Sequence, residues 1–370
     1  MRGKLAIVLL VGLIVSLAVY HHSHSPAPVP APESEPAAPS VATPQLPTPH
    51  VTASAPPTEP PVEEPRKTNN AYARLSVRLL NGGELPKLDP AQLESYLAAN
   101  HQNAGSLLAA LRTTGDPKFL LEAMQKYPND PRVAYAAAFR ADATPEDRRQ
   151  WLEALKQSDP NNSLGGYLLA GNYLKSGQTE QALQELQSAS GKSNWQDYSW
   201  DFMQNSEEAF LAAGYPEAEA RAVAASSVLL PELAPLKGLG LKLGDLAKSY
   251  QQAGDPASAQ AALQMAAYLG QQVSYSPQQP LINTLVGLVI ERNALGAMDP
   301  AAPYGNSGQT VQDRLSEIAQ QRATIKDLNQ RSSGLLEQMS DQDMASYLDR
   351  MKTFGELPTM KWALDKYGQH

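Results

Sequence analysis

Two segments of the chain carry the same residue types at seven equivalent positions. In the first segment these are Leu169, Ala170, Tyr173, Gly177, Ala182, Leu186 and Ala189; in the second they are Leu246, Ala247, Tyr250, Gly254, Ala259, Leu263 and Ala266. Every equivalent pair is 77 residues apart. Seven matches at one offset indicate an internal repeat, in which each unit buries its apolar face only by stacking on its neighbours.

Helix signals recur along the chain from Asn70 onward, and no segment shows the alternation of a half-buried strand. Asp89, Thr144 and Asp255 each precede a proline, as N-cap residues do, and Thr310 with Asp313 and Ser340 with Asp343 resemble capping boxes. Glycines at positions 115, 177, 214 and 254 end short helices. The sequence therefore predicts an all-α body of short helices joined by tight turns.

The repeat resembles the tetratricopeptide repeat family, whose pattern of small and large positions the seven residues fit, with Pro160 ending the preceding unit. The resemblance implies a solenoid of helical hairpins. In it, Ala170 and Ala247 lie where the first helix of a unit crosses the second, Ala182 and Ala259 fill the matching place, Gly177 and Gly254 form the turns, and Tyr173 and Tyr250 wedge between helices. The offset exceeds two periods of about 34 residues, so residues 191–200 or 230–238 should loop out.

The resemblance also implies a binding surface, because the family usually binds partners along the concave first helices. The groove-facing residues would include Tyr167, Lys175, Asp245, Lys248, Gln251 and Gln252. The Lys and Asn that grip a C-terminal carboxylate in some members are replaced here by Tyr167/Gly171 and Gly244/Lys248. Capture of a peptide tail by that route is therefore not expected.

An aromatic cluster, residues 195–202, lies between the two repeat units. Trp195, Tyr198 and Phe202 are predicted to share one face of a helix. Two interpretations stay open: the cluster joins the two units as a packing plug, or Trp195 and Tyr198 form an exposed anchor for a peptide or glycan.

The N-terminal region predicts export. Arg2 and Lys4 precede the uncharged segment Leu5 to Tyr20, and we interpret residues 1–20 as a membrane anchor with a cytoplasmic N-terminus, or as a cleaved signal peptide. Residues 21–66 hold fourteen prolines and predict a disordered linker. We expect a single-pass protein of the bacterial inner membrane, its body outside the cytoplasm; cleavage would give a periplasmic or secreted protein instead.

The body is expected to divide into a repeat region, residues 67–300, and a C-terminal helical region, residues 301–370. The latter should hold one long helix, residues 311–339, with a coiled-coil-like seam. The seam comprises Val311, Leu315, Ile318, Arg322, Ile325, Asn329, Ser332, Leu336 and Met339. It would pack against the final helices in a monomer, the interpretation we favour, with its polar members facing water, or it would mediate self-association.

Catalytic and metal-binding patterns are not evident. The chain has no cysteine, and the body has only His101 and His370, which argues against nucleophilic and metal chemistry; no cofactor is expected. A net charge of −8 disfavours nucleic acid. We predict a non-catalytic scaffold that binds a protein or peptide partner in the cell envelope. An enzyme that attacks cell-wall polymer through groove carboxylates, or a purely structural spacer, are the alternatives.

Overall fold

A computed structural model describes residues 70–275, 279–305 and 308–368. This part of the chain is almost entirely helical, with sixteen helices and one short hairpin of strands. They are α2 (Ala71–Leu80), α3 (Pro90–Ala99), α4 (Ala104–Thr114), α5 (Lys118–Lys126), α6 (Pro131–Ala138), α7 (Pro145–Ser158), α8 (Leu164–Lys175), α9 (Thr179–Ser190), α10 (Ser199–Ala212), α11 (Glu217–Ser226), α12 (Leu233–Gln252), α13 (Pro256–Ser274), α14 (Leu281–Leu295), β1 (Pro303–Tyr304), β2 (Gln309–Thr310), α15 (Val311–Leu336), α16 (Asp341–Phe354) and α17 (Glu356–Tyr367).

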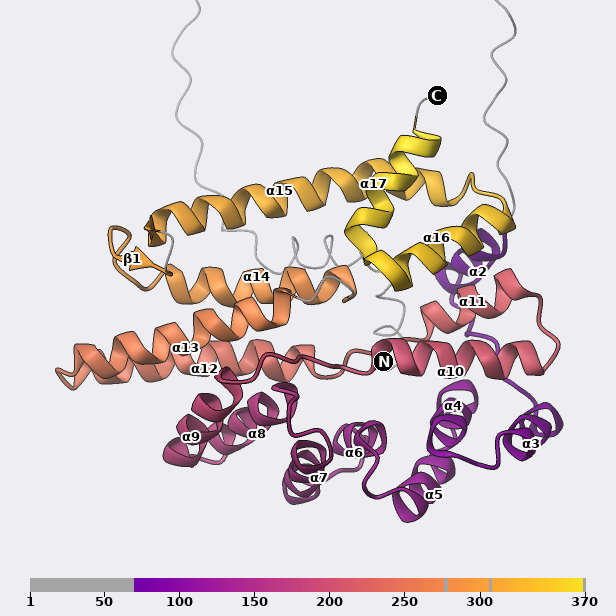
Figure 1. Cartoon of the computed structure of the whole chain (residues 1–370), viewed down its shortest axis with the longest axis horizontal. Coiled ribbons are helices and arrows are strands. Elements are labelled where there is room, and N and C mark those ends of the chain that lie inside the picture. Colours follow the sequence, from indigo (N-terminus) through magenta and orange to yellow (C-terminus); the bar gives the residue numbers. More distant parts are fainter. Residues whose placement is uncertain (1–69, 276–278, 306–307, 369–370) are drawn as a thin grey trace, which may run out of the picture.

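The helices form tiers (Figure 1). Helices α4 to α9 pack in consecutive pairs along one side, and α10 and α12 run across them, with α10 packed on α4 and α12 on α8. Helices α13 and α14 follow, and α15, α16 and α17 cover the opposite side. The predicted anchor and linker, residues 1–66, lie outside the described residues. Among the helices that the structure describes, none is both long and apolar enough to cross a membrane.

The two repeat segments occupy the pairs α8–α9 and α12–α13. Ala170, Ala182, Ala247 and Ala259 are buried, as small residues at close helix crossings must be. Gly177 and Gly254 turn the chain with φ values of 75° and 77°, which L-residues with side chains rarely adopt. Tyr173 and Tyr250 are half-buried against the core. The second pair is longer, with helices of 20 and 19 residues against 12 and 12.

The predicted caps agree with the structure. Thr144 and Thr310 form capping boxes, Asp89 and Asp255 cap α3 and α13, and the Ser340 hydroxyl accepts from the Asp343 amide. Two features of the C-terminal region differ from expectation. Helix α15 ends at Leu336 rather than at residue 339. The loop before it, expected to have no regular structure, forms the antiparallel strand pair β1–β2, in which Pro303 pairs with Thr310.

The two ends of the described body meet. The Asn70 side-chain amide donates to the carbonyls of Leu336 (2.8 Å) and Met339 (2.7 Å), and the Ala71 amide donates to Asp341 Oδ1 (2.7 Å). Helix α2 therefore packs against α11 and α16 and joins the start of the body to its C-terminal helices.

A buried ion pair fixes α15 to α14. Arg314 donates through Nε and Nη2 to the two oxygens of Glu291, at 2.9 Å each, and Glu291 is fully buried. Tyr304 from β1 adds a 2.9 Å hydrogen bond to the same carboxylate. Within the seam of α15, Val311, Ile318 and Ile325 are buried. Asn329 and Ser332 are also buried, so the expectation that the polar seam residues face water is wrong for these two.

Candidate functional site

Part of the face that was predicted to bind a partner, together with neighbouring faces of α4 and α6, is covered by the chain itself. On α4, the Arg112 guanidinium lies 4.0 Å from the ring of Phe202 in α10. On α6, Tyr135 contacts the same ring, with centroids 5.8 Å apart. On α8, Gly171 faces Leu239 of α12. Helices α10 and α12 thus occupy the space that a partner would use along α4, α6 and α8.

A short extended segment completes this cover. The plug segment, residues 194–198, runs beside the start of α8, where Ser163 N–H donates to Asn194 O (2.9 Å). The Asn162 side chain holds both polar groups of the Gln196 backbone: Nδ2 donates to the carbonyl (2.9 Å) and Oδ1 accepts from the amide (3.1 Å). Trp195 packs on Tyr167, with ring centroids 6.0 Å apart.

The structure separates the predicted partner-binding residues into two groups. Tyr167, Trp195 and Tyr198 are at most 9% exposed, so they pack inside the chain and offer no surface to a partner. Lys175, Asp245, Lys248, Gln251 and Gln252 are exposed at the C-terminal ends of α8 and α12. We call these five residues, which were predicted to share one binding face, the exposed groove end.

The aromatic cluster is not one helical face. Helix α10 begins at Ser199, so Trp195 and Tyr198 precede it, and Tyr198 takes a left-handed conformation with φ 58°. The Tyr198 hydroxyl donates to Asp159 Oδ2 (2.7 Å). Trp195, Tyr198 and Phe202 are all buried, which agrees with the packing-plug interpretation. It does not agree with the interpretation of Trp195 and Tyr198 as an exposed anchor.

A buried polar cluster includes Asp197 of the plug segment. Tyr135 donates to Glu232, which immediately precedes α12, and Asn283 of α14 donates to Asp197 Oδ2 (2.9 Å). Ser199 donates to Asp197 Oδ1 through its amide (3.0 Å) and its hydroxyl (2.6 Å). Burial, and secondarily the charge of Asp197, raises the pKa of Glu232 to about 8. Glu232 is therefore mainly protonated at neutral pH.

This cluster offers no accessible acid–base pair. Glu232 is fully buried and Asp197 is 6% exposed, so a polymer chain could not reach either carboxyl group in this structure. Among the described residues, no group of three or more Asp, Glu, His or Cys side chains is arranged to hold a metal ion.

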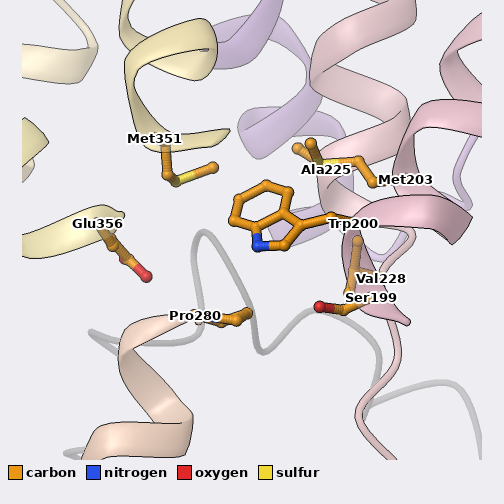
Figure 2. A pocket seen from close by; sticks show the side chains of 8 residues that line it. All are labelled: Ser199, Trp200, Met203, Ala225, Val228, Pro280, Met351 and Glu356. Carbon is orange, nitrogen blue, oxygen red and sulfur yellow. The ribbon is translucent and has the colours of Figure 1, made fainter. Parts of the chain in front are cut away.

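A cleft opens between α10, α11 and the C-terminal helices (Figure 2). Its cavity has a volume of about 30 Å³, room for about two water-sized groups. The walls are apolar and comprise Trp200, Met203, Ala225, Val228, Pro280 and Met351. Two polar side chains, Ser199 and Glu356, complete the lining.

Glu356 reaches into this cleft from the start of α17 (Figure 2). The residue is partly exposed, but its carboxyl end is enclosed, and Oε2 accepts from the Leu281 amide at the start of α14 (2.8 Å). Enclosure raises the pKa of Glu356 to about 7. Tyr72 and Tyr347 lie near it, and burial raises the pKa of both, so neither is charged near neutral pH.

Sequence reasoning did not identify Asn162, Glu232 or Glu356 as notable, and it placed Trp200 in the aromatic cluster without assigning it to a cleft. Glu356 follows Gly355 and begins an amphipathic helix, a pattern that resembles any exposed first-turn carboxylate. Glu232 lies in one of the two segments expected to loop out, and a charge at that place predicts exposure rather than burial. Nothing in the local sequence shows which distant helices cover these residues.

In comparisons with known proteins, no family model and no curated protein matches the chain.

Proposed function

We propose that the protein is an exported, membrane-anchored scaffold of the bacterial cell envelope that binds a protein partner without catalysis. The observation that carries the proposal is a single hydrophobic core that runs from α2 to α17 through every helical pair. A body built in this way presents fixed helix ends and clefts, which suits recognition. The resemblance of residues 169–189 and 246–266 to tetratricopeptide units supports the same class of function.

The exposed groove end is the surface that we assign to the partner. Lys175, Lys248 and Asp245 carry charge there, and Asp245 and Lys248 are 3.5 Å apart with both side chains largely exposed. Exposed pairs of this kind contribute little to stability, about 0–1 kcal/mol. They are therefore free to exchange their mutual contact for contacts with another protein.

Site-specific photocrosslinking in living cells tests the proposal. A photoreactive amino acid at Gln252, in the exposed groove end, should give a discrete adduct with one protein, and Lys248→Glu should reduce the yield. The matched control carries the same group at Gln312, an exposed position at the start of α15. Equal adducts from both positions, or none from Gln252, would argue against a partner at this surface.

A further inference from the structure

We propose that the cleft between α10, α11, α16 and α17 is a recognition site for the ammonium end of a lysine side chain on the protein partner. The proposal rests on the scaffold function above and adds a second contact, with defined chemistry. It is carried by the position of one carboxylate at the end of an apolar cleft.

The shape of the cleft fits the end of a lysine side chain. The cleft is small and mainly apolar, which suits the unbranched stem and compact ammonium group of a lysine side chain. Trp200 and Met351 come from opposite walls, α10 and α16 (Figure 2). An aromatic ring and a thioether are apolar surfaces against which lysine methylenes pack well.

The charge of the cleft fits as well. Leu281 N–H satisfies Oε2 of Glu356 at 2.8 Å, which fixes the carboxylate and keeps it at the cleft rather than turned to solvent. A carboxylate enclosed among apolar groups is costly unless it is paired, and an incoming cation supplies the pair. Trp200 lines the same cleft, and an aromatic ring there can attract a cation.

The ionisation of Glu356 gives the site a pH dependence. With a pKa of about 7 in the empty cleft, Glu356 is only partly ionised at neutral pH. Because the ammonium binds the ionised form, its affinity should rise by about tenfold between pH 6 and pH 8. Tyr72 and Tyr347, two tyrosines near Glu356, stay neutral over this range.

Fluorine NMR of the full chain in detergent micelles can test this with n-butylammonium chloride as the probe. The chain has four tryptophans, so 5-fluorotryptophan gives four signals, and Trp200→Phe identifies the one in the cleft. We expect butylammonium to shift the Trp200 signal in a saturable way, and n-butanol, of similar shape without charge, to leave it nearly unchanged. The affinity should rise from pH 6 to pH 8.

Glu356→Gln is the decisive variant, because the amide keeps an oxygen for the Leu281 hydrogen bond and removes only the charge. It should weaken butylammonium binding by about tenfold, whereas Glu94→Gln, on an exposed part of α3, should not change it. Equal binding by Glu356→Gln, equal shifts with n-butanol, or no saturable shift would overturn the proposal. None of these outcomes depends on the crosslinking result at Gln252, so the two proposals can fail separately.

Discussion

Glu232 is a buried acid whose protonation makes the stability of the folded state depend on pH. Its pKa of about 8 lies well above the value of an exposed carboxyl group, because burial and the charge of Asp197 oppose ionisation more strongly than Tyr135 and Arg112 favour it. Between about pH 4.5 and pH 8 the folded state holds a proton that the unfolded state releases. Stability from this group is complete at low pH and is lost as pH rises through about 8.

The corresponding prediction is that Glu232→Gln flattens this pH dependence. The variant cannot ionise, so its melting temperature should fall less than that of the natural chain between pH 5.5 and pH 8. The free energy of unfolding should change less steeply with pH in the variant, and the two slopes should differ by up to about 1.4 kcal/mol per pH unit. Calorimetry of both chains at several pH values measures it, with Glu94→Gln as the exposed control. Parallel curves for Glu232→Gln and the natural chain would show that Glu232 is not protonated in the folded state.

Two glycines, Gly270 and Gly287, lie where α13 crosses α14 and allow the two helix backbones to approach closely. A methyl group at Gly270 would lie 2.5 Å from Glu291 N and 2.7 Å from Gly287 O, which are backbone atoms that cannot move aside easily. Gly270→Ala should therefore destabilise by about 1–3 kcal/mol or more. The matched change, Gly238→Ala in α12, meets no atom within 4 Å and should stabilise by about 0.5–1 kcal/mol. Thermal unfolding of both variants measures these opposite changes in stability. A gain in stability for Gly270→Ala would contradict the close approach of the two helices.

At the scale of helices, the sequence predicted the local features and missed the packing between distant ones. Caps such as Thr310 and turns such as Gly254 depend on neighbours within a few residues, so their signals are readable. The plug segment looked helical because its aromatics recur with helical spacing. Its actual course is set by Asn162, 34 residues away, which holds the Gln196 backbone. The cleft of Trp200 and Glu356 likewise joins helices that are far apart in the sequence.

The attachment of α15 to α14 yields a prediction at this scale. Arg314→Leu removes the cationic partner of the buried Glu291 carboxylate and should cost about 3–5 kcal/mol. Arg331→Leu, on the same helix, breaks an ion pair with Asp327 in which both side chains are 61% exposed, and should cost about 0–1 kcal/mol. Urea unfolding followed by circular dichroism compares the two variants. Similar losses would mean that Glu291 does not depend on Arg314.

For the molecule as a whole, the contacts of Asn70 and Asp341 join the first helix of the described body to its last ones. The repeat region and the C-terminal helices predicted as separate parts therefore share α2 and one core. The cleft exists only because the C-terminal helices return to α10 and α11. A partner bound there would contact both regions at once, which a simple open stack of repeats would not allow.

The packing of the C-terminal helices against the rest of the body also bears on the oligomeric state. Val311, Ile318 and Ile325 of the long-helix seam are buried within one chain, and α15 packs on α14 and α17. A seam already covered in this way cannot also pair with a second copy unless the C-terminal helices open. We therefore expect the full chain in density-matched micelles to sediment with the mass of one chain, 39.9 kDa.

Ile325→Glu should leave that mass unchanged but lower the melting temperature, because it places a charge among α15 contacts inside the chain. The matched change Lys326→Glu, on the exposed side of the same turn, should alter neither quantity much. A mass near two chains that falls to one in Ile325→Glu would instead assign the seam to self-association.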